Sequence, residues 1–268
     1  WSELMKMDVA ELLDHILTIQ TETYGQFEIQ QLTNFIKQHQ VKRVLDIGTG
    51  QGAFLLKLSS ALQDVQFCGV EHNQDFIRKA KTQKEILRAK NVEFIEATFN
   101  AEYPLEKHDL ILSRYCLQHS LNPKDFNTEV SKRLHDHGAY ITTDEYLFES
   151  NIDDAVWREF YESWMKCFEL AGANPVIPRN ITTWLSQVGF KSIENRIQIY
   201  SPATIGGDEF KSLIMCLSTV LCKIYPHVMK ESLLGKLDHW FDEISVSKKV
   251  DPHVQVAYAT GFKNEDLI

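Results

Sequence analysis

Short runs of β-branched and other apolar residues alternate with amphipathic helical segments between residues 41 and 145. Five strands are expected there, and they read VKRVLDI, VQFCGVE, VEFIE, DLILS and AYITTD. The helical segments between them lie at residues 53–62, 75–90 and 123–135. Strands that alternate with helices of this length form βαβ units with right-handed connections. The pattern therefore predicts an α/β fold with a doubly wound, mostly parallel sheet that helices cover on both faces.

Helices dominate the rest of the chain. A capping box at Asp8 and Glu11 opens the first of two expected N-terminal helices. Two further strands, SIENRIQIYS and VQVAYATGF, bring the sheet to seven strands. We expect one domain with four parts: an N-terminal helical cap at 1–40, an α/β core at 41–149, a helical lid insertion at 150–190, and C-terminal strands of the core at 191–268 with a helical insertion at about 206–246.

Four aromatic residues recur at helical spacing within the expected lid: Trp157, Tyr161, Trp164 and Phe168. A stripe of this kind is typical of ordinary core packing. The alternative is that some of these side chains face a substrate.

Composition bears on the kind of ligand. The formal net charge is −9 and the pI is near 5.6, whereas nucleic-acid binding draws most of its affinity from Lys and Arg side chains that neutralise phosphates. No apolar run approaches the roughly 20 residues that span a bilayer. The five cysteines contain no C-x-x-C pair, and His135 and His137 are expected at a helix end, where a protonated His is favourable. We therefore expect a soluble, cytoplasmic protein, a monomer or homodimer, that acts on a small molecule and binds no nucleic acid, membrane or metal.

The stretch VLDIGTGQGAF at residues 44–54 reads as a buried strand, a tight turn and the start of a helix. In open α/β sheets, ligands bind at this turn, beyond the carboxyl ends of the strands. The stretch satisfies G-x-G-x-x-A, a pattern that binds the pyrophosphate of a dinucleotide such as NAD. It also satisfies D-x-G-x-G-x-G, for which the cofactor carries no phosphate. The glycines alone leave both interpretations open.

Two carboxylates narrow the choice. Glu71, at the end of the next strand, can accept hydrogen bonds from both hydroxyls of a ribose, in NAD or in any other adenosine cofactor. Asp46 lies two residues ahead of the first glycine. Its charge would repel a pyrophosphate and stabilise an ammonium or sulfonium group. Asp46 thus favours S-adenosylmethionine, which carries an adenosine and both of these cationic groups.

Several motifs, in this order, resemble the class I S-adenosylmethionine-dependent methyltransferases. VLDIGTGQG looks like the first motif of that family, GVEHN like its acidic second motif, and VEFIEATF like the segment that lines the adenine. DLILSRYCLQHSLNP resembles the fourth-strand motif, and EVSKRLHDHGAYITTDEY resembles the helix, turn and fifth strand. The resemblance implies a Rossmann-like methyltransferase fold with S-adenosylmethionine as cofactor and S-adenosylhomocysteine (SAH) as product. Thr98 departs from the pattern, because the family often has Asp at that position.

The resemblance also implies which residues hold the cofactor. Gly48 and Gly50 lie against its methionine part, Glu71 holds the ribose, and Thr98 and Phe99 lie at the adenine. The full set of expected cofactor-binding residues is Asp46, Gly48, Thr49, Gly50, Gly52, Glu71, His72, Thr98, Phe99, Ser113 and Arg114.

Methyl transfer from a sulfonium is an in-line displacement with a good leaving group, so the protein mainly holds the nucleophile and the methyl group about 3 Å apart and excludes water. A hydroxyl or ammonium acceptor also benefits from a general base with a near-neutral pKa. The expected catalytic residues are His119 and Tyr115, in the loop after the fourth strand, and Glu145, just past the fifth. Asp144 and Tyr146 are further candidates for contacting the acceptor. For His119 the alternative is a structural contact to the cofactor or a helix cap.

The sequence favours methyl transfer to the oxygen, nitrogen or carbon of a small molecule in an enclosed pocket. No Asn-Pro-Pro-Tyr-type motif follows the fourth strand, which disfavours methylation of planar amides and bases. Three alternatives stay open: a protein methyltransferase, an NAD-dependent oxidoreductase, and an inactive interaction subunit that still binds the cofactor.

Overall fold

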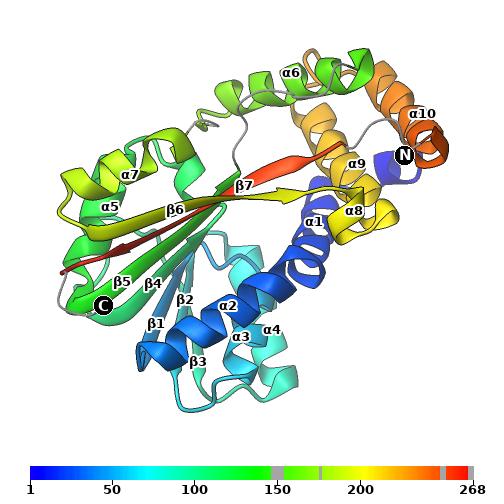
Figure 1. Cartoon of the computed structure of the whole chain (residues 1–268). Helices are drawn as coiled ribbons and strands as arrows, with labels where there is room; N and C mark the ends of the chain where they lie inside the picture. The colour runs from blue at the N-terminus through cyan, green and yellow to red at the C-terminus, as the bar shows by residue number, and fades with distance from the viewer. Residues whose placement is uncertain (146–153, 175–176, 248–251, 265–268) are drawn as a thin grey trace. The chain divides into compact units, whose positions relative to one another are not determined.

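The computed structural model describes residues 1–145, 154–174, 177–247 and 252–264. The chain divides into two compact units, coloured by residue number in Figure 1. Unit 1 comprises Trp1–Gln26, Leu147–Pro175 and Ile199–Gln255, and unit 2 comprises Phe27–Tyr146, Val176–Gln198 and Val256–Ile268. Each unit is therefore assembled from three separate stretches of the chain.

Unit 2 is built on a seven-stranded sheet with the order β3-β2-β1-β4-β5-β7-β6. The strands are β1 (Arg43–Ile47), β2 (Gln66–Glu71), β3 (Val92–Glu96), β4 (His108–Arg114), β5 (Leu134–Glu145), β6 (Lys191–Tyr200) and β7 (Val254–Phe262). β1 to β5 pair in parallel, and β7 is antiparallel to β5. The predicted α/β fold, a doubly wound and mostly parallel sheet of seven strands, is confirmed.

Helices cover both faces of this sheet. They are α2 (Tyr24–Gln38), α3 (Ala53–Ser60), α4 (Gln74–Leu87), α5 (Pro123–Lys132) and α7 (Ile177–Gln187), with a short 3-10 turn η2 (Leu117–His119). Figure 1 shows α2, α3 and α4 on one side of the sheet and α5 and α7 on the other. Val44 of β1 packs into the core on one face, whereas Leu45 and Ile47 pack into the core on the other. Burial on both faces explains why the apolar residues Val44, Leu45 and Ile47 do not alternate with polar ones.

β5 is longer than predicted. The helix expected to end at residue 135 ends at Lys132, and the strand starts at Leu134, which is fully buried and lies opposite His108 of β4. The strand runs through residues 135–138, where the register with β4 shifts between Leu134 and Ala139. His135 and His137 consequently lie on a strand, and the predicted helix end was wrong.

The helical segments near the C-terminus also differ from expectation. The single helical region expected near 206–246 is two helices, α9 (Gly207–Ile224) and α10 (Glu231–Ser247). The break follows Tyr225, whose φ of −128° and ψ of 59° are non-helical, as expected for a residue that precedes proline.

Unit 1 is helical. Its elements are η1 (Leu4–Lys6), α1 (Val9–Glu22), α6 (Ala155–Leu170), α8 (Pro202–Ile205), α9 and α10. The predicted capping box is present, because Asp8 accepts a hydrogen bond from Glu11 N and Asp8 N donates to the Glu11 carboxylate, at 2.8 Å each. Across the part of the chain that is described, none of the helices combines the length and hydropathy that a bilayer span requires.

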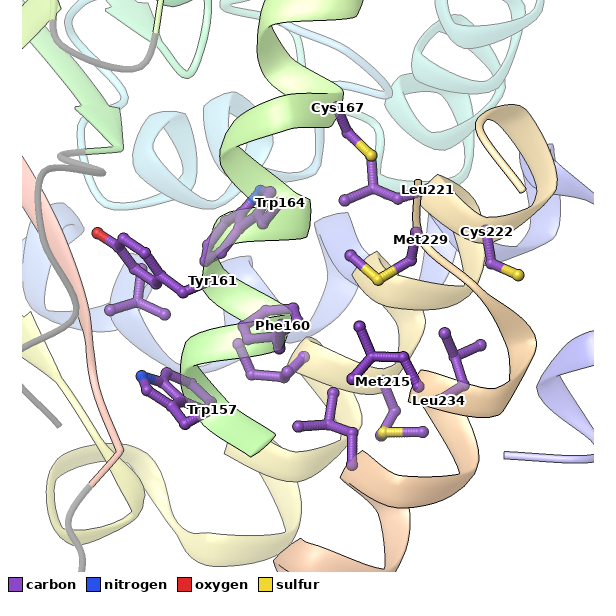
Figure 2. Packing of buried hydrophobic residues seen from close by; sticks show 14 of the residues in the cluster. Trp157, Phe160, Tyr161, Trp164, Cys167, Met215, Leu221, Cys222, Met229 and Leu234 are labelled. Atoms are coloured by element: carbon purple, nitrogen blue, oxygen red, sulfur yellow. The ribbon is translucent and has the colours of Figure 1, made fainter. Parts of the chain in front are cut away.

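The aromatic stripe of α6 lies inside unit 1. Trp157 and Trp164 are 1% exposed, and both belong to a cluster drawn from α6, α9, α10 and the turn between the last two. Figure 2 shows Phe160 and Trp164 beside Met215 and Met229. Core packing, the first interpretation of this stripe, is therefore confirmed.

Candidate functional site

The glycine loop joins β1 to α3 in a left-handed conformation. Gly48, Gly50 and Gly52 have φ angles of 71°, 57° and 75°, which residues with a side chain rarely adopt. The loop is anchored to β2, because the amides of Gly48 and Thr49 donate to Val70 O at 2.8 and 3.1 Å. A Cβ at Gly52 would lie 2.4 Å from the Phe94 ring. Sterics as well as backbone angles therefore require glycine at the start of α3.

Glu71 stands at the carboxyl end of β2 and is tied to this loop. Its Oε2 accepts a hydrogen bond from Gly50 N at 3.2 Å, and its Oε1 accepts one from Asn73 N at 2.8 Å. His72 Nδ1 lies 3.0 Å from the same Oε1, but the His72 side chain is 77% exposed. Two backbone amides thus fix the orientation of a carboxylate that is 7% exposed.

Asp46, near the end of β1, is 3% exposed. Burial raises the pKa of its carboxyl group to about 6, and the negative charges of Glu71 and Glu28 act in the same direction, while Arg114 opposes them. A buried carboxylate in such surroundings is stabilised by a cationic ligand. This agrees with the preference for a cationic ligand inferred from the sequence.

Arg114, the last residue of β4, forms a buried ion pair that sequence reasoning missed. Its Nε donates to Glu28 Oε2 at 2.6 Å, and the two side chains are 13% and 3% exposed. The other oxygen of Glu28 accepts a hydrogen bond from the Tyr258 hydroxyl at 2.7 Å. The Arg114 guanidinium also lies 3.6 Å from the centre of the Phe54 ring. Burial alone would lower the pKa of Arg114, but the charges of Glu28, Tyr115 and Asp46 and the hydrogen bond to Glu28 together outweigh it, and the net shift is upward.

A chain of hydroxyl groups links β4 to β5. Tyr140 and Ser113 are hydrogen-bonded at 2.6 Å, Ser113 donates to Thr142 at 3.0 Å, and Thr142 donates to Asp144 Oδ2 at 2.7 Å. Asp144 also accepts a hydrogen bond from Gln118 N at 3.0 Å, and burial raises its pKa to about 7. The hydroxyl of Ser113, an expected cofactor contact, is thus engaged in a fully buried network.

Gln118 clamps Glu145, and sequence reasoning missed it. Its amide nitrogen donates to Glu145 Oε2 at 3.1 Å, while Glu145 N donates to the Gln118 side-chain oxygen at 2.9 Å. Burial raises the pKa of Glu145 to about 7. His119 Nε2 lies 3.5 Å from the same amide nitrogen. His119 is exposed overall, and the partial burial of its ring lowers its pKa.

The other predicted residues also lie at the carboxyl edge of the sheet. Tyr115 has an unusual φ of 50° and its amide donates to Thr143 O at 2.6 Å, so the loop after β4 is held against β5. Thr98 is exposed just past β3, and the Phe99 ring lies 5.4 Å from that of Phe126 on α5. The fold thus brings all the predicted site residues to one edge of unit 2, while Tyr146 lies outside the described residues. Within that same described part, no group of three potential metal ligands occurs.

A groove of about 990 Å³ lies on the sheet face beside α2. Glu28, Arg114 and Tyr258 line it together with Gln31, Phe35 and Arg196. The ion pair of Arg114 and Glu28 therefore forms part of the wall of this groove.

The strand order, the glycine loop after β1 and the buried carboxylate at the end of β2 define a class I S-adenosylmethionine-dependent methyltransferase fold. Residues 38–194 match a family model described as a methyltransferase domain. This match covers more than half of the chain, and the chain belongs to that methyltransferase family. Membership confirms the predicted class and cofactor and decides against the NAD-dependent oxidoreductase.

Individual relatives are distant. The chain is 24% identical over 205 residues to a carboxy-S-adenosyl-L-methionine synthase from Nautilia profundicola, covering 70% of this chain and 86% of that protein. The crystal structure of the YcgJ protein from Bacillus subtilis is similar with a TM-score of 0.62 and 18% identity, covering 90% of this chain and 99% of that one. The structure of the plantazolicin methyltransferase BpumL in complex with SAH is similar with a TM-score of 0.57 and 16% identity, covering 96% of this chain and 90% of that one. These two structures establish the shared fold and no more.

Proposed function

We propose that this chain transfers a methyl group from S-adenosylmethionine to a small-molecule acceptor at the carboxyl edge of the unit 2 sheet. The observation that carries the proposal is the pairing of two buried carboxylates with the glycine loop. Glu71 is held by the amide of Gly50, and Asp46 is buried two residues ahead of Gly48. One carboxylate suits a ribose, and the other suits a cation.

The residues present fit this cofactor. A carboxylate offers about four lone-pair sites, and three of those on Glu71 are engaged, one of them only by the exposed ring of His72. Ribose hydroxyls can take the remaining site and displace His72. Asp46 would hold the positive end of the methionine part, while the backbone of Gly48 and Gly50 lies against it. When bound, S-adenosylmethionine supplies a methyl group on a positively charged sulfur, which needs no further activation.

Glu145 is the proposed general base. A base is effective when its pKa is near the working pH, and burial raises the pKa of Glu145 to about 7. Gln118 donates one hydrogen bond to the carboxylate and accepts one from the Glu145 backbone amide, so the position of Glu145 is restricted. Glu145 would accept the proton from a hydroxyl or ammonium acceptor, and His119 and Tyr115 lie on the loop after β4.

A small molecule is the favoured acceptor class. The net charge of −9 disfavours nucleic acid. An enclosed acceptor pocket is part of the proposal, but the α6 stripe does not supply its walls, because those rings lie in the core of unit 1.

The test is SAH release from isotopically labelled S-adenosylmethionine with a panel of small amines, alcohols and carbon acids. We expect turnover with at least one class of small acceptor, and a loss of rate near pH 7 in Glu145→Gln. Label that enters only proteins from a cell extract would instead identify a protein methyltransferase. An absence of transfer to any acceptor, with cofactor binding intact, would favour the inactive interaction subunit.

A further inference from the structure

We propose that Glu28 is a positioning residue that neutralises Arg114 and so keeps Asp46 available for the positive charge of the cofactor. This inference rests on the proposed function, since it concerns the affinity of the same site. Glu28 lies on α2, outside every sequence motif that points to the cofactor.

Four elements of unit 2 build the arrangement. Arg114 at the end of β4 donates to Glu28 of α2 at 2.6 Å, and Tyr258 of β7 donates to the other oxygen of Glu28 at 2.7 Å. Phe54, in the first turn of α3, covers the guanidinium at 3.6 Å. Glu28 therefore has both carboxylate oxygens engaged and cannot leave Arg114 without losing two hydrogen bonds.

Arg114 and Asp46 lie on neighbouring strands: Asp46 is opposite Leu112 in the β1–β4 register, and Arg114 follows two residues further along β4, so it faces the same side of the sheet. Arg114 lowers the pKa of Asp46 and Glu28 raises it, so both charges are felt at that carboxylate. Charges interact strongly when water is excluded, and the three side chains are largely buried. Arg114 Nη2 is also buried without a hydrogen-bond partner in the described structure. Without Glu28, the positive charge of Arg114 would be left to interact with Asp46.

The consequence depends on the charge of the ligand. Asp46, Glu28 and Arg114 together carry one net negative charge, and replacing Glu28 with Gln removes it. S-adenosylmethionine carries a sulfonium that SAH lacks. The substitution should therefore reduce the affinity for S-adenosylmethionine more than the affinity for SAH. A variant that only loosens the packing should reduce the affinities for both ligands equally.

The experiment is calorimetric titration of S-adenosylmethionine and SAH into the full chain and its variants at low salt, with thermal unfolding as the check on folding. For Glu28→Gln we expect about a tenfold weaker affinity for S-adenosylmethionine and about threefold for SAH. Tyr258→Phe is the matched control, because it removes a hydrogen bond to Glu28 and no charge. It should change both affinities by less than about twofold.

A double variant, Glu28→Gln with Arg114→Gln, restores the net charge and should recover the wild-type ratio of the two affinities. It also serves if Glu28→Gln alone does not fold. Equal weakening of both ligands, no weakening, or the same change in Tyr258→Phe would overturn the inference. So would a double variant whose affinity ratio differs from that of the wild type. If the wild type binds neither ligand, the proposed function fails and this inference falls with it, whereas wild-type binding with equal weakening in Glu28→Gln overturns the role of Glu28 alone.

Discussion

The two units bury different kinds of side chain. In the described residues, every buried Asp, Glu, Arg and His lies in unit 2, and the buried polar groups of unit 1 are uncharged. Burying a charge costs several kcal/mol unless it is paired and hydrogen-bonded. Unit 1 avoids that cost and is stabilised by aromatic and aliphatic packing. Unit 2 accepts this cost, and Asp46, Glu71 and Asp144 do so at the carboxyl edge of its sheet, where a cationic cofactor would be held.

A contrast within unit 2 separates structural charge from functional charge. Arg133 is fully buried, and it donates to Pro104 O and to the carbonyl and carboxylate oxygens of Glu129. Arg114 is paired through Nε, but its Nη2 has no hydrogen-bond partner among the described residues. The charge of Arg133 is thus paired and hydrogen-bonded within the fold, whereas Arg114 keeps an unused donor beside the candidate site.

The largest expected effect is on the packing of unit 1. Trp164→Ala should reduce the free energy of unfolding by about 3 to 5 kcal/mol, because it removes a buried ring and leaves a cavity. Trp164→Phe, the matched control, should cost about 1 to 2 kcal/mol. Denaturant unfolding measures both. If instead stability stayed unchanged and SAH affinity fell sharply, the stripe would be facing a ligand and the contrast between the units would fail.

Next in size is the loss of the ribose contact. Glu71→Ala should weaken cofactor binding by roughly 2 kcal/mol or more, through loss of charge-assisted hydrogen bonds. Glu96→Ala is the control, since Glu96 lies opposite Glu71 in the sheet register but is exposed. Calorimetry with SAH gives both values. Equal effects of the two substitutions would remove Glu71 from the cofactor site.

A buried carboxylate should also make stability depend on pH. Folding raises the pKa of Asp144 from an ordinary 3.8 to about 7, so between these values the folded protein holds a proton that the unfolded chain has lost. The stability linked to this proton is present at low pH and is lost as the pH rises toward 7. The free energy of unfolding of Asp144→Asn should therefore rise relative to that of the wild type between pH 5 and 7, by at most about 1.4 kcal/mol per pH unit. Unfolding curves at several pH values test this, and a constant difference between the two proteins would contradict the shift.

The smallest effect is expected at His119. Because Glu145 is clamped and His119 is exposed, His119→Ala should lower the methyl-transfer rate by less than about tenfold and leave the pH profile near 7 in place. The pH dependence of kcat/KM with an identified acceptor measures this. If the change of rate near pH 7 disappeared in His119→Ala but persisted in Glu145→Gln, His119 would be the general base and Glu145 would not.

The sheet and the glycine loop could be predicted because their signals are local. Strand and helix periodicities lie within short windows, and three glycines and two carboxylates fall in one stretch and the strand after it. The break between α9 and α10 was also visible in principle, since Pro226 follows Tyr225. The start of β5 could not be predicted, because it depends on the pairing of Leu134 with β4.

The supporting residues of the site could not be predicted for a similar reason. Glu28 meets Arg114 and Tyr258 across 86 and 230 residues of sequence, and no periodicity connects them. Gln118 clamps Glu145 only because the loop after β4 lies against the end of β5. Sequence motifs identify groups that would touch the cofactor, whereas the residues that position those groups emerge from the folded sheet.

The most direct test of the account is a calorimetric comparison of S-adenosylmethionine, SAH and NAD on the wild-type chain and on Asp46→Asn. We predict that the wild type binds the first two and gives no response to NAD. Asp46→Asn should reduce the affinity for S-adenosylmethionine more than the affinity for SAH, because it removes the buried charge that favours a cation. Binding of NAD without any response to the other two ligands would contradict the account.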